Sequence, residues 1–164
     1  MKAVVVKRIL YGALALGIMT VIFVSSAQTS VTSAAASGRF TAFIQRIFFK
    51  SWEEYSEADF EKALYALHFL IRKVAHFSVF LLLAVSVLGF LSTLPMKWSV
   101  RILAAIAFTA LYAVFDEFHQ SFTAGRSMMV FDMLVDSAGG VLGALSMTGI
   151  LLSLGKHPKT EEKL

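Results

Sequence analysis

Four long apolar stretches stand out in the pattern of hydrophobic and polar positions along the chain. Crossing the hydrocarbon core of a bilayer takes about 20 apolar residues in helical conformation, and each stretch is long enough. The four cover roughly residues 9–27, 74–94, 100–118 and 128–154. The pattern therefore predicts an all-α fold, an integral membrane bundle of four transmembrane helices, and we expect residues 1–164 to form a single domain.

The first apolar stretch also resembles a signal peptide. It follows the basic start MKAVVVKR and ends in FVSSAQ, where Ser25 and Ala27 are small residues of the kind found at a cleavage site. We expect the stretch to be kept as a membrane anchor, because the three remaining helices would make a thin bundle.

The segment between the first two spans, residues 28–73, is only partly polar. Apolar residues recur at i, i+3, i+4, i+7 and i+8 in its FTAFIQRIFFK stretch, at Phe40, Phe43, Ile44, Ile47 and Phe48. This spacing predicts an extra amphipathic helix in the membrane interface, either resting on the bundle or acting as a lid. The capping-box sequence SWEE at 51–54 follows, so we expect a new helix to begin there and to run into the second span.

Composition supports the membrane assignment and excludes several classes of function. Hydrophobic residues make up 57% of the chain and charged residues 16%, against about 25% charged residues in soluble domains, and the mean hydropathy is +0.73. The net charge is +4, but the Lys and Arg residues are scattered and form no basic stripe, which argues against nucleic-acid binding. The absence of cysteine excludes a disulfide framework, a thiol nucleophile and a thiolate metal site.

The distribution of basic residues indicates the orientation in the membrane. If the N-terminus is cytoplasmic, eight Lys and Arg residues lie inside and seven outside. The count alone therefore hardly favours one orientation over the other. The inner ones crowd short loops and tails at helix ends, where the positive-inside rule applies. We therefore expect both termini in the cytoplasm, with residues 28–73 outside and 155–164 as a cytoplasmic tail.

Polar clusters occur in or beside the last three spans, and this orientation places all of them at the outer end of the bundle. They comprise Arg72, Lys73 and His76 at the second span, Asp116, Glu117, His119, Gln120 and Arg126 at the end of the third, and Asp132 and Asp136 in the fourth. Their convergence at one end predicts a common site.

Helical phase sorts these residues further, because residues three and four apart share a face. Asp116, His119 and Gln120 are expected to point together, whereas Glu117 lies about 100° away from Asp116. In the fourth span Asp132 and Asp136 share a face with the GxxxG pair at positions 139 and 143, which lets another helix approach closely. These two acids are therefore expected to face into the bundle.

Ionised groups at membrane depth cost about 2.5–3.5 kcal/mol each on insertion scales, so they normally have partners and mark function. The candidate catalytic residues are His76, His119 and Asp116, and the candidate ligand-binding residues are Arg72, Lys73, Glu117, Gln120, Arg126, Asp132 and Asp136. In this hypothesis the two arginines hold a phosphate by bidentate hydrogen bonds. The two histidines act as acid or base near neutral pH.

Two other uses of these residues are open. A divalent metal held by Asp116, His119, Asp132 and Asp136 is chemically reasonable, although a spacing of three on one helix is weakly specific for metal. Alternatively, the charges form only a salt-bridge and hydrogen-bond network that holds three helices together. The sequence assigns no cofactor.

The order of these clusters resembles the VanZ-like family of small bacterial membrane proteins. The likeness rests on RKVAHF, YAVFDEFHQSFTAGR and DMLVDSAGGVLG, with the SSAQ that closes the first span. The family's marked residues would be Arg72, Lys73, His76, Asp116, Glu117, His119, Gln120, Gly125, Arg126, Asp132 and Gly140. The sequence departs from the expected pattern at Ala124, Phe80 and Asp136, where proline, tyrosine and asparagine are expected. Asp136 adds a negative charge to the site.

The resemblance implies a multi-pass protein of the bacterial cell membrane, named for a member associated with teicoplanin resistance. Our first hypothesis is that the outer site binds an anionic lipid-linked envelope molecule, and in its stronger form also processes it. The alternative is a non-catalytic membrane interaction protein that shields lipid-linked precursors or docks an envelope enzyme. An ion path is disfavoured, because the inner halves of the spans, such as AIAF and GILLSL, offer almost no polar groups.

Overall fold

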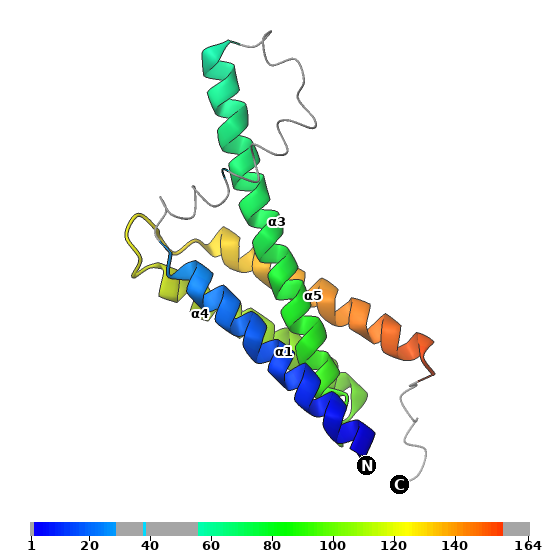
Figure 1. Ribbon diagram of the computed structural model, residues 1–164. Helices are drawn as coiled ribbons and strands as arrows, with labels where there is room; N and C mark the ends of the chain where they lie inside the picture. The colour runs from blue at the N-terminus through cyan, green and yellow to red at the C-terminus, as the bar shows by residue number, and fades with distance from the viewer. Residues whose placement is uncertain (1, 29–37, 39–55, 156–164) are drawn as a thin grey trace.

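A computed structural model describes residues 2–28, 38 and 56–155. Within these residues the chain forms four helices and no strand: α1 (Lys2–Ser26), α3 (Glu57–Leu91), α4 (Trp98–Gln120) and α5 (Val130–Ser153) (Figure 1). All four are long and apolar enough to cross a membrane. The prediction of an all-α membrane protein with four spans is confirmed, whereas the predicted interfacial helix over 40–48 lies outside the described residues.

The second predicted span differs most from the structure, because α3 begins well before residue 74. Ser56 is its N-cap: the hydroxyl accepts a hydrogen bond from the backbone N–H of Asp59 and donates one of 2.6 Å to the Asp59 carboxylate. This reciprocal cap satisfies an otherwise unpaired N–H group at the helix start. The predicted capping box at 51–54 lies outside the described residues. The helix that runs into the second span begins at Glu57, after the extended Ser56, and so starts later than the expected position 51.

Glycines let α5 lie directly against α3. A Cβ atom added to Gly139 would come within 2.3 Å of the Phe77 carbonyl oxygen, and one on Gly143 within 2.2 Å of the Leu81 carbonyl oxygen. Only glycine permits this backbone contact, as the GxxxG spacing predicted. Gly140, one residue round the helix, faces Thr109 of α4.

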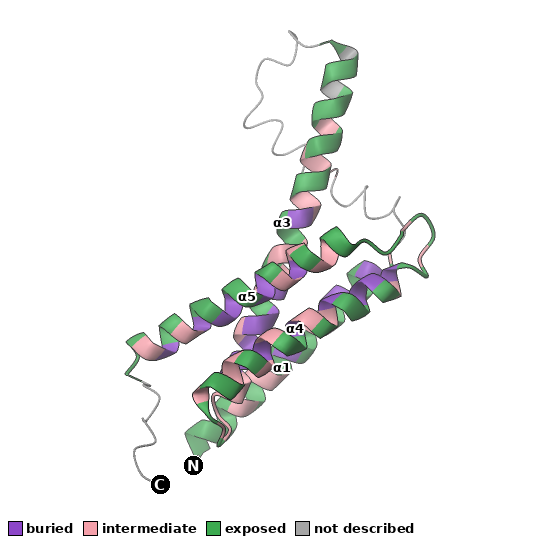
Figure 2. Ribbon diagram, turned by 180° about the vertical axis from the view of Figure 1, so that it is seen from behind, coloured by how far each residue is buried: buried purple, intermediate pink, exposed green. Residues whose placement is uncertain are grey.

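Two buried apolar clusters form the core between the helices (Figure 2). One contains Ala84, Leu88, Ala105, Ala144, Met147 and Leu151, and the other contains Ala15, Ile22, Phe80, Leu83 and Ala113. The outward faces of the helices carry many exposed Leu, Val, Ile and Phe side chains, as expected for surfaces that contact lipid.

Three helix ends meet at one end of the bundle. In Figure 1 the end of α1, the end of α4 and the start of α5 lie close together, while α3 passes them and projects beyond. Tyr112 of α4 donates a 2.8 Å hydrogen bond to the Met19 carbonyl of α1, which fixes these two helices against each other. The polar residues of α3, α4 and α5 lie at this same end of the bundle.

Candidate functional site

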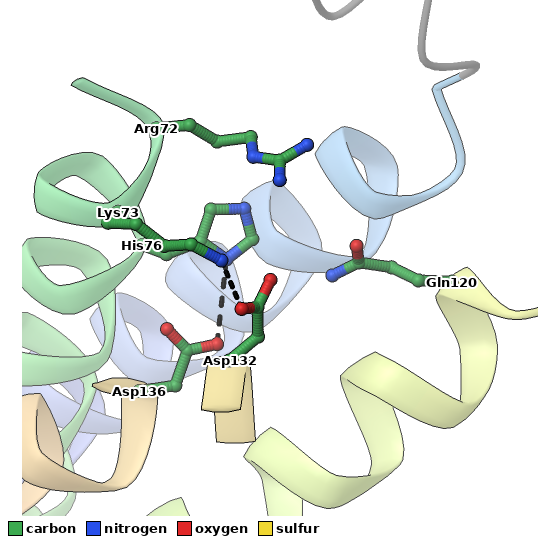
Figure 3. A pocket seen from close by; sticks show the side chains of 6 residues that line it. All are labelled: Arg72, Lys73, His76, Gln120, Asp132 and Asp136. Carbon is green, nitrogen blue, oxygen red and sulfur yellow. Dashed lines mark hydrogen bonds and ion pairs between the residues drawn. The ribbon is translucent and has the colours of Figure 1, made fainter. Parts of the chain in front are cut away.

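A small polar pocket lies where α3, α4 and α5 meet (Figure 3). Its lining residues are Arg72, Lys73 and His76 from α3, Gln120 from α4, and Asp132 and Asp136 from α5. The volume is about 10 Å³, which is room for roughly one water molecule or ion. The structure thus brings residues from all three predicted clusters together.

Lys73 and Asp132 form an ion pair across α3 and α5, and both side chains are largely buried. The Lys73 ammonium also lies 4.9 Å from the ring centre of Phe69 and 5.6 Å from that of Phe131. A carboxylate and two aromatic faces already surround this ammonium. Lys73 therefore joins two helices, and Asp132 is engaged in the same pair.

Asp116 and Asp136 are two buried carboxylates close to one histidine. Asp116 is 2% exposed and Asp136 is 1% exposed. The Nδ1 atom of His76 lies 3.5 Å from Oδ2 of Asp136, and one potential ligand atom from each of the three residues lies within 4.8 Å of the others. Asp136 Oδ2 has no hydrogen-bond partner among the described residues.

Gln120 connects Asp116, Arg126 and α1. Its Nε2 donates 2.8 Å and 3.3 Å hydrogen bonds to Asp116 Oδ2 and Ser26 Oγ, and its Oε1 accepts a 2.9 Å bond from Arg126 Nη1. Thr123 also bonds to the Ser26 carbonyl at 3.3 Å. Ser26 is a site residue that sequence reasoning missed, although the small polar residues ending the first span were a signal.

Arg126 returns to the site on the loop after α4. Gly125 has a positive φ of 76°, a conformation that glycine adopts without steric cost. The guanidinium is half-buried, and burial together with the charge of Arg72 lowers the pKa of Arg126 below its ordinary value. Its Nε atom is buried without a hydrogen-bond partner, and in the described part of the chain neither Arg72 nor Arg126 forms an ion pair.

Glu117 lies outside the pocket, on the side of α4 that helical phase predicted. It is 1% exposed, and its Oε2 atom accepts a 2.9 Å hydrogen bond from the backbone N–H of Met129, the N-cap residue of α5. The structure therefore gives Glu117 a contact at the start of α5, and it does not line the pocket.

His119 also lies outside the pocket. Its ring stacks on Phe23 of α1 with ring centres 4.1 Å apart, and its Nδ1 atom is buried without a partner among the described residues. Of the four predicted metal ligands, only Asp116 and Asp136 belong to the cluster of potential ligand atoms, and His76 takes the place expected for His119. The expected set changes because His119 faces α1 and Asp132 is paired with Lys73.

Comparison with known proteins identifies the family. A family model described as VanZ/LLP1 matches residues 11–152. No curated protein and no solved structure matches the chain. The match covers all four helices except the first residues of α1 and the last residue of α5. The chain is a multi-pass membrane protein and belongs to the VanZ/LLP1 family.

Proposed function

We propose that the protein binds an anionic lipid-linked envelope molecule at the outer leaflet of a bacterial cell membrane, through Arg72 and Arg126. The observation that carries the proposal is a pair of neighbouring guanidiniums with no carboxylate ion-pair partner in the described chain. The buried Nε of Arg126 is an unused donor. Guanidinium donors match the oxygens of a phosphate bidentately, which makes a phosphate the fitting ligand.

The other charges at this end already have partners, which supports the assignment to the two arginines. Lys73 is paired with Asp132, Glu117 accepts from the start of α5, and Asp136 lies beside His76. A phosphate bound between the two arginines would occupy the mouth of the pocket, because the pocket itself has room for only about one water molecule or ion. The lipid chain would lie along the apolar outer faces of the helices.

The orientation belongs to the proposal. Both termini are placed in the cytoplasm, because basic residues crowd the short loop and the tails at the opposite end of the bundle. The pocket then opens to the outer leaflet, where lipid-linked envelope precursors are used. Residues 1–164 would act as one membrane domain.

Catalytic processing of the lipid is the stronger form of the proposal. His76 is the fitting acid or base, because it lines the pocket and lies beside the Asp136 carboxylate. His119 is stacked on α1 and has no place in this scheme. Without turnover, the same site would shield a lipid-linked precursor or dock an envelope enzyme, and an association with teicoplanin resistance fits either form.

Mass spectrometry of lipids that co-purify in mild detergent tests the proposal. We expect a phosphate-bearing polyprenyl lipid with the wild-type protein and its loss from the Arg72→Ala/Arg126→Ala double variant. Lys62→Ala is the matched control, since Lys62 is an exposed cation on the part of α3 outside the pocket. The same lipid in equal amount on the double variant would contradict the proposal.

A further inference from the structure

We propose that His76, Asp116 and Asp136 form a binding site for a divalent cation of the first transition series, such as Zn²⁺ or Mn²⁺. The three residues come from α3, α4 and α5, and one potential ligand atom from each lies within 4.8 Å of the others. An imidazole nitrogen with two carboxylate oxygens is a donor set that these cations accept, whereas Mg²⁺ and Ca²⁺ prefer oxygen alone.

Oδ2 of Asp136 has the 3.5 Å contact with His76 but no hydrogen bond, which points to a missing ligand. Oδ2 is buried without a hydrogen-bond partner among the described residues, and the whole side chain is 1% exposed. Asp136 lies one turn before Gly139, on the face of α5 that packs into the bundle. A buried carboxylate oxygen is costly unless a donor or a cation satisfies it. A cation between the helices would satisfy it directly.

The spacing of His76 and Asp136 suits two ligands of one ion. Nδ1 and Oδ2 are 3.5 Å apart, longer than a usual hydrogen bond between nitrogen and oxygen. Metal–ligand bonds of about 2.0–2.2 Å place neighbouring ligand atoms about 3.0–3.5 Å apart. An ion would therefore fit between these two atoms with little movement of either side chain.

Asp116 is held in place to supply the third ligand. Gln120 donates to its Oδ2 atom at 2.8 Å, and Arg126 in turn donates to Gln120 at 2.9 Å. Hydrogen bonds of this kind orient a ligating carboxylate and tune its affinity for metal. A pocket of about 10 Å³ beside His76 and Asp136 suits a single ion, and it is too small for a lipid headgroup.

Within the group itself, two carboxylates outnumber the one imidazole, and the nearest ammonium and guanidinium groups have other contacts, apart from Arg72, which lines the same pocket. Lys73 is paired with Asp132, and Arg126 is bonded to the Gln120 side chain. Two carboxylates face one imidazole from three different helices. A bound cation would balance this charge and tie the three helices together at the end where the pocket lies.

The test uses the metal alone, without lipid, on the full chain in detergent. After EDTA treatment and exchange into metal-free buffer, Zn²⁺ or Mn²⁺ is titrated, and bound metal and the midpoint of thermal unfolding are measured. We expect one ion per chain and a rise in the midpoint. Asp136→Asn and His76→Gln should each lower the metal affinity by at least about tenfold.

Two matched variants separate this site from general metal binding. His119→Gln removes a histidine at this end of the bundle that does not line the pocket, and Glu61→Gln removes an exposed acid of α3 that does not line it either. Both variants should keep one bound ion per chain. No ion bound by the wild-type protein, or equal loss in the His119→Gln variant, would overturn the proposal. If Asp136→Asn fails to fold, the absorption spectrum of Co²⁺ added to the wild-type chain still tests whether the protein coordinates the ion. Ligand-field bands support coordination, and the spectrum of the hydrated ion overturns it.

Discussion

Glu117 accepts a 2.9 Å hydrogen bond from the backbone N–H of Met129 and so connects α4 to the start of α5. The contact fixes where α5 begins, and Asp132 and Asp136 lie within the next two turns. We expect Glu117→Ala to lower the free energy of unfolding by about 1–3 kcal/mol, because it removes a buried charged acceptor and leaves the Met129 N–H group without its partner. Glu117→Gln retains an acceptor and should cost less. Equal thermal unfolding midpoints for wild type and Glu117→Ala in one detergent would contradict the capping role.

Close packing of α5 on α3 is tested at Gly143. An added methyl group would overlap the Leu81 carbonyl oxygen, so Gly143→Ala must push the helices apart. Overpacking of this kind costs about 1–3 kcal/mol of stability. Gly149→Ala is the matched control on the same helix, since no atom lies within 4 Å of its added Cβ. A lower unfolding midpoint is expected only for Gly143→Ala, and identical midpoints would refute the close approach.

The cysteine-free sequence makes the orientation directly measurable. Ala124→Cys places an exposed thiol in the loop before α5, and Pro95→Cys places one in the loop between α3 and α4. In intact cells a membrane-impermeant maleimide should label position 124 and leave position 95 unlabelled until the cells are lysed. The opposite result would place the pocket on the cytoplasmic side.

Much of the fold was predictable because spans and faces follow from periodicity along one helix. The four apolar stretches correspond to α1, α3, α4 and α5, and the GxxxG spacing on α5 identified its packing face. Asp116 and Gln120 were expected to point together, and their side chains do form a hydrogen bond of 2.8 Å. Each of these predictions depends only on residues of a single helix.

Contacts between helices were less predictable, because they depend on how deep and how rotated each helix sits in the bundle. His119 and Gln120 lie about 60° and 40° to either side of Asp116 on α4, and an aromatic ring on α1 decides that His119 stacks there. His76 is therefore the histidine beside the acids, although phase on α4 favoured His119. The pairing of Lys73 with Asp132, which leaves both arginines unpaired, likewise could not be predicted, because it joins residues of two different helices.

Affinity for a polyprenyl phosphate, measured on the protein in nanodiscs by native mass spectrometry, tests phosphate binding by Arg72 and Arg126 most directly. We expect Arg72→Ala and Arg126→Ala each to weaken binding by about tenfold or more, because each removes charged donors worth about 1.5–3 kcal/mol. Arg126→Lys should weaken it less than Arg126→Ala, since the charge remains but the bidentate geometry is lost. Lys62→Ala should match the wild type. Equal affinities for the wild type and both alanine variants would contradict the assignment of the phosphate to these two arginines.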